Sequence, residues 1–132
     1  MSRFILSVIV VFSIIVALLP APASSQDRGV AERLGKVGFP VSCSAAAQQQ
    51  FERAVAQLHS FWLKAATQAF AGVAQTDPSC AMAHWGTAMT LLGNPLAAPP
   101  APKALAEGWA AVERATTIGA RTPREADYIG AI

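Results

Sequence analysis

The 132-residue chain lacks the short motifs that mark common active sites. It has no serine elbow of the hydrolase type, no glycine-rich phosphate loop and no zinc-binding helix motif. Its acidic residues show no pairing typical of general acid–base catalysis; those considered are Glu52, Glu107, Glu113, Glu125 and Asp127. The sequence therefore predicts a protein that is not an enzyme, and it gives no catalytic residue and no cofactor.

Clusters of basic residues are also missing. The ten Lys and Arg residues are scattered and interleaved with eight Asp and Glu residues, which leaves a net charge of only +2. Nucleic acids and anionic membrane surfaces are bound through basic stripes or patches. Neither is an expected partner of this chain.

A long apolar run lies at the N-terminus. Arg3 precedes it, residues 4–19 form it with only two serines inside, and Pro20 ends it. The run is shorter than the roughly 20 apolar residues that a membrane-spanning helix needs. Small residues follow Pro20, as at a signal peptidase site. The pattern is typical of a secretory signal peptide.

The predicted signal peptide covers residues 1–23, with cleavage between Ala23 and Ser24. An uncleaved N-terminal anchor is the alternative, and only this anchor would bring the protein to a membrane. A lipid anchor is not expected, because the first cysteine is Cys43. We therefore expect an exported protein that is periplasmic or extracellular after cleavage.

Residues 24–42 mix serine, glycine and charged residues without a sustained period, which predicts a flexible lead-in. Its last part carries Val37, Phe39 and Val41, which we expect to pack against the first helix. A serine hydroxyl can accept a hydrogen bond from the free N–H groups of a first helical turn. Ser42 and Ser44 are therefore both candidate caps of that helix.

Apolar residues at spacings of three and four predict a series of amphipathic helices. In the first helix they are Phe51, Val55, Leu58, Phe61 and Trp62. No Gly or Pro separates the first two helices, so we expect a tight turn near residues 60–64. The predicted helices cover residues 45–63, 64–75, 79–92, 103–118 and 123–132.

Turn residues separate the later helices. Asp77 is expected to cap the third helix, with Pro78 at its first position, where no N–H is needed. Residues 93–95 (Gly-Asn-Pro) end this helix, and a proline-rich connection follows. Thr122 and Glu125 have the spacing of a capping box at the start of the last helix.

The order small, aromatic, small, proline at Ala66, Phe70, Val73 and Pro78 resembles the second half of a tetratricopeptide repeat. In a unit of about 34 residues, Ala54 then takes the small position of the first helix. Gln50 and Gln57 stand where such repeats usually carry Trp and Tyr. The resemblance implies an all-α fold in which antiparallel helix pairs stack into an α-solenoid.

More narrowly, residues 34–132 resemble a set of exported bacterial tetratricopeptide-repeat proteins of uncertain function. The matching blocks are Ser42-Cys43, Phe51–Phe61, Ala69-Phe70, Asp77–Met89 and Gly93–Pro95. The resemblance implies a scaffold whose concave face binds a protein or peptide partner. Members of the set are usually longer, so the chain is alternatively an N-terminal portion of a protein whose functional residues lie beyond Ile132.

The resemblance also implies a repeat domain at residues 43–132 with about two and a half repeats. Repeat one covers residues 45–78, repeat two 79–121, and the start of repeat three 122–132. Small residues let neighbouring helices approach, and larger ones fill the spaces between them. The expected packing residues are Ala54, Leu58, Ala66, Phe70, Pro78, Trp85, Ala88 and Trp109. Trp62, like Trp85 and Trp109, is expected in the core, with a groove lining as the alternative.

Cys43 and Cys80 are the only cysteines, and they are about one repeat length apart. Each lies at the start of a first-type helix, and in stacked repeats these helix starts are neighbours. A disulfide between the two residues is therefore expected. Free buried thiols are one alternative, and a metal-binding or redox role is another.

A second functional hypothesis is a periplasmic copper-binding protein. His59, Met82 and His84, together with the thiols, are ligand types that suit soft metals. The spacing of these residues matches no metal motif. Packing roles for the methionine and surface positions for the histidines are the favoured interpretation, so no metal site is predicted.

Overall fold

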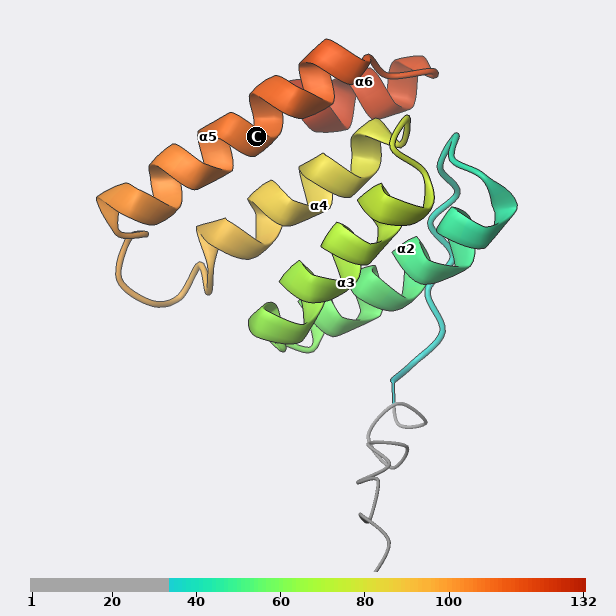
Figure 1. The fold of residues 1–132 in the computed structure, drawn as a ribbon. Helices are drawn as coiled ribbons and strands as arrows, with labels where there is room; N and C mark the ends of the chain where they lie inside the picture. Colours follow the sequence, from blue (N-terminus) through green and yellow to red (C-terminus); the bar gives the residue numbers. More distant parts are fainter. Residues whose placement is uncertain (1–33) are drawn as a thin grey trace, which may run out of the picture. The chain divides into compact units, whose positions relative to one another are not determined.

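The structure is a computed structural model that describes residues 34–132. The predicted signal peptide at 1–23 lies outside the described residues. Between residues 34 and 132 the chain forms helices and no strands, so the all-α prediction is confirmed (Figure 1). The helices are α2 (Ala45–His59), α3 (Leu63–Thr76), α4 (Ala81–Leu92), α5 (Pro102–Ile118) and α6 (Pro123–Gly130).

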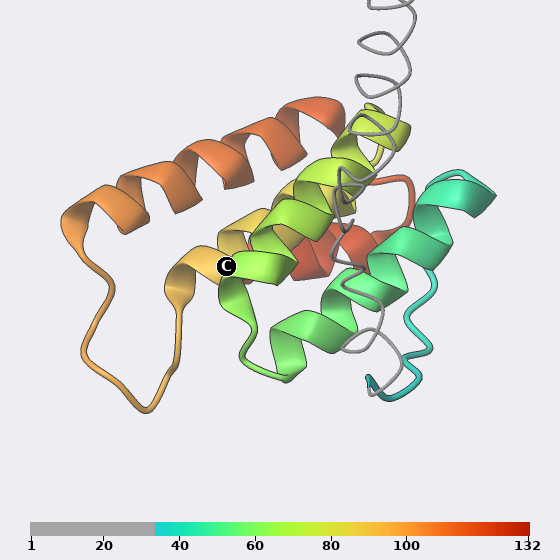
Figure 2. The same ribbon diagram turned by 60° about the horizontal axis from the view of Figure 1, so that its bottom comes forward.

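The helices pack mainly against their neighbours in sequence. α3 packs against α2 on one side and α4 on the other, and α5 packs against α4 (Figure 1). The shorter α6 contacts α4 and α5, and Figure 2 shows it from a second side. α4 is thus the central helix, and α2, α4 and α6 come together on one face of the described domain.

The first helix begins as predicted and ends earlier. Ser44 is its cap, because the Ser44 hydroxyl accepts a hydrogen bond of 3.3 Å from the Ala47 N–H. α2 ends at His59 rather than near residue 63, since the next three N–H groups turn back to carbonyls of residues 56–58. Phe61 takes a left-handed backbone conformation in this turn (φ 57°), which is uncommon for a bulky residue. Trp62 is 38% exposed, so its predicted place in the core is wrong.

The connection between α3 and α4 also differs from the prediction. α4 begins at Ala81, and neither Asp77 nor Pro78 belongs to its first turn. Instead the Asp77 carboxylate accepts hydrogen bonds from the N–H and hydroxyl of Ser79, at 3.0 and 2.6 Å. Aspartate side chains commonly bond the backbone two residues on, and this local bond competes with capping. Pro78 is exposed, so it is not a packing residue.

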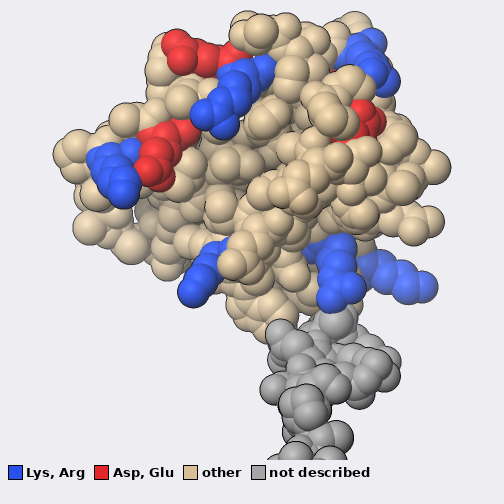
Figure 3. Space-filling view, viewed as in Figure 1, with Lys and Arg blue, Asp and Glu red and all other residues tan. Residues whose placement is uncertain are grey.

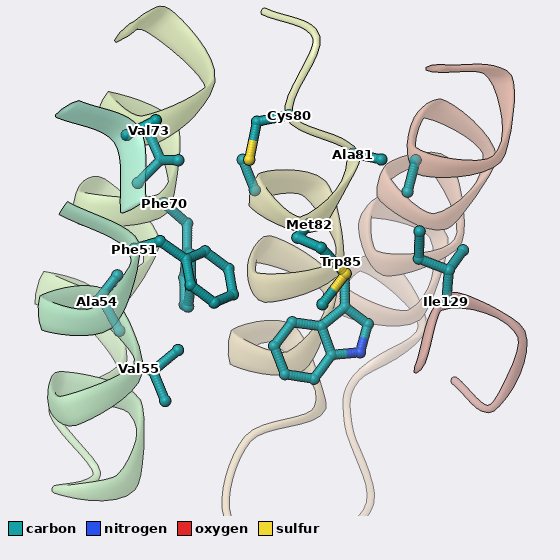
Figure 4. Close-up of a cluster of buried hydrophobic side chains, with 14 residues drawn as sticks. Phe51, Ala54, Val55, Phe70, Val73, Cys80, Ala81, Met82, Trp85 and Ile129 are labelled. Carbon is teal, nitrogen blue, oxygen red and sulfur yellow. The ribbon is translucent and has the colours of Figure 1, made fainter. Parts of the chain in front are cut away.

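The core lies between α2, α3 and α4, with α6 closing one side. Its largest fully buried side chains include Phe51, Phe70 and Met82 (Figure 4). Of the expected packing residues, Ala54, Ala66, Phe70, Trp85 and Ala88 are buried, and Leu58 is half-buried against the core. Trp109 on α5 is 65% exposed, so its predicted core position is wrong. In the described domain α5 packs on α4, its buried residues are the small Ala111 and Ala115, and Trp109 lies at the hollow between the two helices.

The predicted disulfide between Cys43 and Cys80 is present, with Cα atoms 5.1 Å apart. It joins the residues that precede α2 and α4, as expected for neighbouring helix starts. In the chain-entropy picture, a cross-link that closes a loop of this length stabilises the folded state by roughly 3–4 kcal/mol.

Candidate functional site

An extended stretch of chain lies against the face formed by α2, α4 and α6. We call residues 37–42 the inner segment and the helical surface beneath it the α2–α4–α6 face. Val37, Phe39 and Val41 are half-buried against the core, whereas Gly38 and Pro40 are exposed. This alternation is typical of an extended backbone, whose successive side chains point to opposite sides. The expected packing of these three residues thus reaches beyond α2.

Phe39 is the aromatic anchor of the inner segment. Its ring centroid lies 5.5 Å from that of Phe51 on α2, 5.7 Å from Trp85 on α4 and 5.1 Å from Tyr128 on α6. Aromatic pairs at such distances contribute roughly 0.5–1.5 kcal/mol each beyond their buried area. The Arg124 guanidinium lies 4.6 Å from the Phe39 ring centroid, a cation–π contact on the outer side.

Two side chains of α2 bond the backbone of the inner segment. The Phe39 N–H donates to Glu52 Oε1 at 3.3 Å, and the Phe39 carbonyl accepts from Gln48 Nε2 at 2.9 Å. The Val41 N–H donates to Gln48 Oε1 at 2.8 Å. Gln48 and Glu52 lie one helical turn apart and are joined by their own hydrogen bond of 2.9 Å. They therefore act as one unit that holds two residues of extended chain.

Residues at the start of α6 bond the other half of the inner segment. Arg124 Nη1 donates to the Pro40 carbonyl at 2.8 Å, and Arg121 Nη1 donates to the Ser42 carbonyl at 2.9 Å. The Glu125 carboxylate accepts from both the N–H and the hydroxyl of Ser42, and from the Arg121 N–H at 3.2 Å. Ser42 is therefore not the cap of α2.

Glu125 is only 3% exposed. A buried polar group is tolerated only when it is hydrogen-bonded, and the three donors around the Glu125 side chain meet that requirement. The predicted cap of α6 is confirmed, because the Thr122 hydroxyl accepts from the Glu125 N–H at 3.2 Å. The Glu125 side chain does not return to Thr122 as a capping box would require, because it holds Ser42 instead.

The serines that precede the two cysteines are both tied to Arg121. Besides the Ser42 carbonyl, Arg121 binds the Ser79 hydroxyl, with Nη2 2.7 Å from Oγ. Asp77 adds a further link, since its Oδ2 accepts from the Ser44 N–H at 2.7 Å. The hydrogen bonds from Ser79 and Ser44 lower the pKa of Asp77 below its usual value of 3.8. The end of the inner segment is thus held next to the disulfide.

The residues of the copper hypothesis occupy different structural environments. Met82 is a buried core residue, and both cysteines are in the disulfide, so neither offers a thiolate. His84 is half-buried, and its pKa is lowered by burial and by the charge of Arg114. His59 is exposed at the end of α2. Residues 34–132 contain no group of three or more His, Cys, Asp or Glu that could hold a metal ion.

A second apolar surface lies away from the α2–α4–α6 face. A pocket of about 480 Å³ opens between the α2–α3 turn and the loop after α4, lined by Leu58, His59, Phe61, Leu63, Met89, Leu92, Gly93, Pro95 and Pro100. Leu92 also borders a shallower hollow between α4 and α5 that includes Trp109. Figure 3 shows that the surface over α4 is largely uncharged, with acidic and basic side chains around its margin.

Comparisons with protein-family models, with curated proteins and with solved structures found no match to this chain. Among residues 34–132, no helix has both the length and the apolar character needed to cross a membrane. The function of the chain is therefore inferred from the geometry of the α2–α4–α6 face.

Proposed function

We propose that the protein is an exported, tetratricopeptide-like scaffold that binds a protein or peptide partner along its α2–α4–α6 face and performs no reaction of its own. One observation carries the proposal: side chains of this face bond the backbone of an extended stretch of chain. Backbone N–H and C=O groups are common to all polypeptides, so the same side chains suit an extended partner.

The tetratricopeptide-like interpretation is supported by the way the helices approach one another. α2–α3 and α4–α5 are consecutive helix pairs, and α6 begins a third element against α4. Close approach depends on small residues, and Gly86 in α4 lies directly under the Phe70 ring of α3. A stack of such pairs exposes the first helix of each pair on a common face, which here is the face of α2, α4 and α6.

Export is supported by the disulfide together with the N-terminal apolar pattern. Disulfides form and persist mainly in oxidising compartments such as the periplasm or the extracellular space. The bond between Cys43 and Cys80 therefore agrees with the signal peptide predicted at residues 1–23.

Photo-crosslinking in cells that produce the protein tests the proposal. Tyr128 is replaced by p-benzoylphenylalanine, which keeps an aromatic ring at the edge of the α2–α4–α6 face. We expect one discrete cross-linked protein after illumination, which mass spectrometry then identifies. The control carries the same photoreactive residue at Gln68, which is exposed on α3. Equal cross-linking from both positions, or none from position 128, would contradict partner binding at this face.

A further inference from the structure

We infer that the inner segment, residues 37–42, is an internal ligand of the α2–α4–α6 face, and that the partner is an extended peptide whose aromatic residue replaces Phe39. This inference rests on the proposed function, and it specifies the chemistry of the partner and what the partner must displace.

The inner segment is held in the manner of a bound peptide rather than as part of a helix or sheet. Five backbone groups of residues 39–42 are bonded by side chains of α2 and of the α6 region, and none belongs to a backbone ladder. A sixth, the Ser42 N–H, is bonded by Glu125. The side chain of Phe39 contacts the aromatic rings of the face, Phe51, Trp85 and Tyr128. This division between backbone bonds and a single aromatic anchor fits recognition of an extended peptide.

The outer surface of the inner segment is open to solvent. Gly38 and Pro40 are exposed, as are Arg121 and Arg124, which hold the segment from outside. The core beneath it, in contrast, contains the fully buried rings of Phe51 and Phe70. The bonds from Arg121 and Arg124 to the segment are exposed, and those from Gln48, Glu52 and Glu125 are partly buried. Segments with fewer buried contacts and some exposed hydrogen bonds open at lower free energy than the packed core. The inner segment is therefore able to leave the face while the helices stay folded.

The disulfide limits how far a displaced segment can move. Cys43 follows Ser42 directly and is bonded to Cys80 at the start of α4. A released inner segment stays tethered beside its own site and rebinds as an intramolecular competitor at high effective concentration. A partner must therefore bind the face more tightly than the inner segment does, which suppresses weak or incidental peptides.

The bonding pattern defines where the partner can carry proline. The N–H groups at positions 39, 41 and 42 all donate hydrogen bonds, so proline at any of these positions removes one. Position 40 contributes only its carbonyl, and there the chain itself has Pro40. The expected partner motif is thus an aromatic residue, then any residue including proline, then two residues other than proline.

Hydrogen exchange on the unchanged full chain, with its disulfide intact, tests whether the inner segment opens by itself. We expect the amides of Phe39, Val41 and Ser42 to exchange at least tenfold faster than those of Phe51 and Val55 in α2. Their rates should also be insensitive to low urea, since little surface is exposed in a local opening. Exchange of both groups at one common rate with one urea dependence would overturn the inference, because the segment would then open only on global unfolding.

Peptide binding tests the ligand chemistry. The probe is a fluorescein-labelled synthetic peptide with the sequence of residues 34–42, LGKVGFPVS, added to the full chain and to its Phe39→Ala variant. Fluorescence anisotropy should report at least tenfold tighter binding to the variant, whose own anchor is missing. A Trp62→Ala chain, altered at an exposed aromatic residue outside the face, should bind like the unchanged chain.

Substituted peptides complete the test. Replacing the phenylalanine by alanine, or the valine at position 41 by proline, should weaken binding to the Phe39→Ala chain at least tenfold, whereas alanine at position 40 should not. Equal binding to the unchanged and Phe39→Ala chains would overturn the inference. Cross-linking from position 128 would then still support the proposed function. If the Phe39→Ala chain does not fold, the exchange measurement on the unchanged chain decides the question alone.

Discussion

The close approach of α3 and α4 depends on Gly86, and Gly86→Ala is the sharpest test of it. A Cβ atom at this position would lie 2.6 Å or less from three atoms of the Phe70 ring. Phe70 is fully buried, and its ring packs edge-on against Phe51 with centroids 5.5 Å apart. The ring cannot swing toward solvent, so either it leaves its preferred rotamer or the two helices move apart.

Two opposing effects set the magnitude. Overpacking a well-filled core costs up to about 3 kcal/mol. Alanine in a helix interior is favoured over glycine by about 1 kcal/mol. We therefore expect Gly86→Ala to lower the free energy of unfolding by about 2 kcal/mol. With a urea dependence of 1–3 kcal/mol per molar, the midpoint of unfolding falls by about 1 M.

Gly72→Ala is the matched control. Gly72 also lies inside a helix, α3, but a Cβ at this position would meet no atom within 4 Å other than the nearby backbone of its own helix and its chain neighbours. The same gain in helix propensity should therefore raise stability by up to about 1 kcal/mol. Urea unfolding of the oxidised proteins, followed by circular dichroism at 222 nm, compares the two. If both substitutions stabilise the protein, the close contact between Gly86 and Phe70 is refuted.

A double substitution separates the contact from other effects. Phe70→Leu removes two of the three ring atoms nearest to the new methyl group, Cε1 and Cζ. In the Phe70→Leu background, Gly86→Ala should therefore cost clearly less than in the unchanged protein. The difference is the coupling free energy of the pair. Additive effects of the two substitutions would place the cause of any Gly86→Ala destabilisation elsewhere.

Three further predictions concern charged groups and the disulfide. Glu125→Gln should lower the free energy of unfolding by about 1–3 kcal/mol, because it replaces one buried acceptor oxygen by an NH₂ group that faces a donor. Urea unfolding measures the change, and an unchanged midpoint would contradict the hydrogen bonds to Ser42. The Cys43→Ser/Cys80→Ser variant should lose roughly 3–4 kcal/mol of its free energy of unfolding. Non-reducing mass spectrometry of exported protein should give a chain that starts at Ser24 and is two hydrogens lighter than its reduced form. A start at residue 1 with two free thiols would contradict both export and the disulfide. Burial and a neighbouring arginine lower the pKa of His84 in the folded state. The free energy of unfolding should therefore be highest above the unfolded-state pKa near 6.5 and fall as the pH drops from there to the lower folded-state pKa. His84→Gln should flatten this part of the pH–stability curve, and an unchanged curve would contradict this cause.

Much of the fold was predictable because the apolar spacing in each helix is regular. Phe51 and Val55 identified the buried side of α2, and Phe70 and Val73 that of α3. The cysteine spacing indicated the disulfide once repeats were assumed. Helix ends were less predictable, because several local bonds compete there. The apolar pattern continued through Phe61, whereas α2 ends at His59 and Phe61 has a left-handed backbone conformation.

The candidate site was predictable only in part. Val37, Phe39 and Val41 were expected to pack against the first helix, but the sequence did not indicate that Phe39 also contacts Trp85 on α4 and Tyr128 on α6. The bonds from Arg121 and Glu125 to Ser42 join residues about eighty positions apart, and no local pattern records such contacts. Trp109 illustrates the opposite error: an aromatic residue at helical spacing need not face the core when its helix is packed through small residues.

The disulfide also determines which parts of the molecule transmit mechanical tension. The disulfide between Cys43 and Cys80 closes α2 and α3 into a covalent ring, so a force along the chain can bypass this helical hairpin. A pull on the N-terminal side of Cys43 passes through the sulfur atoms directly into the start of α4. α2 and α3 then carry little of that force, whereas the inner segment, which precedes Cys43, is the first element to be stripped from the helices. Tension on this end of the chain would therefore uncover the α2–α4–α6 face before it unfolds the hairpin.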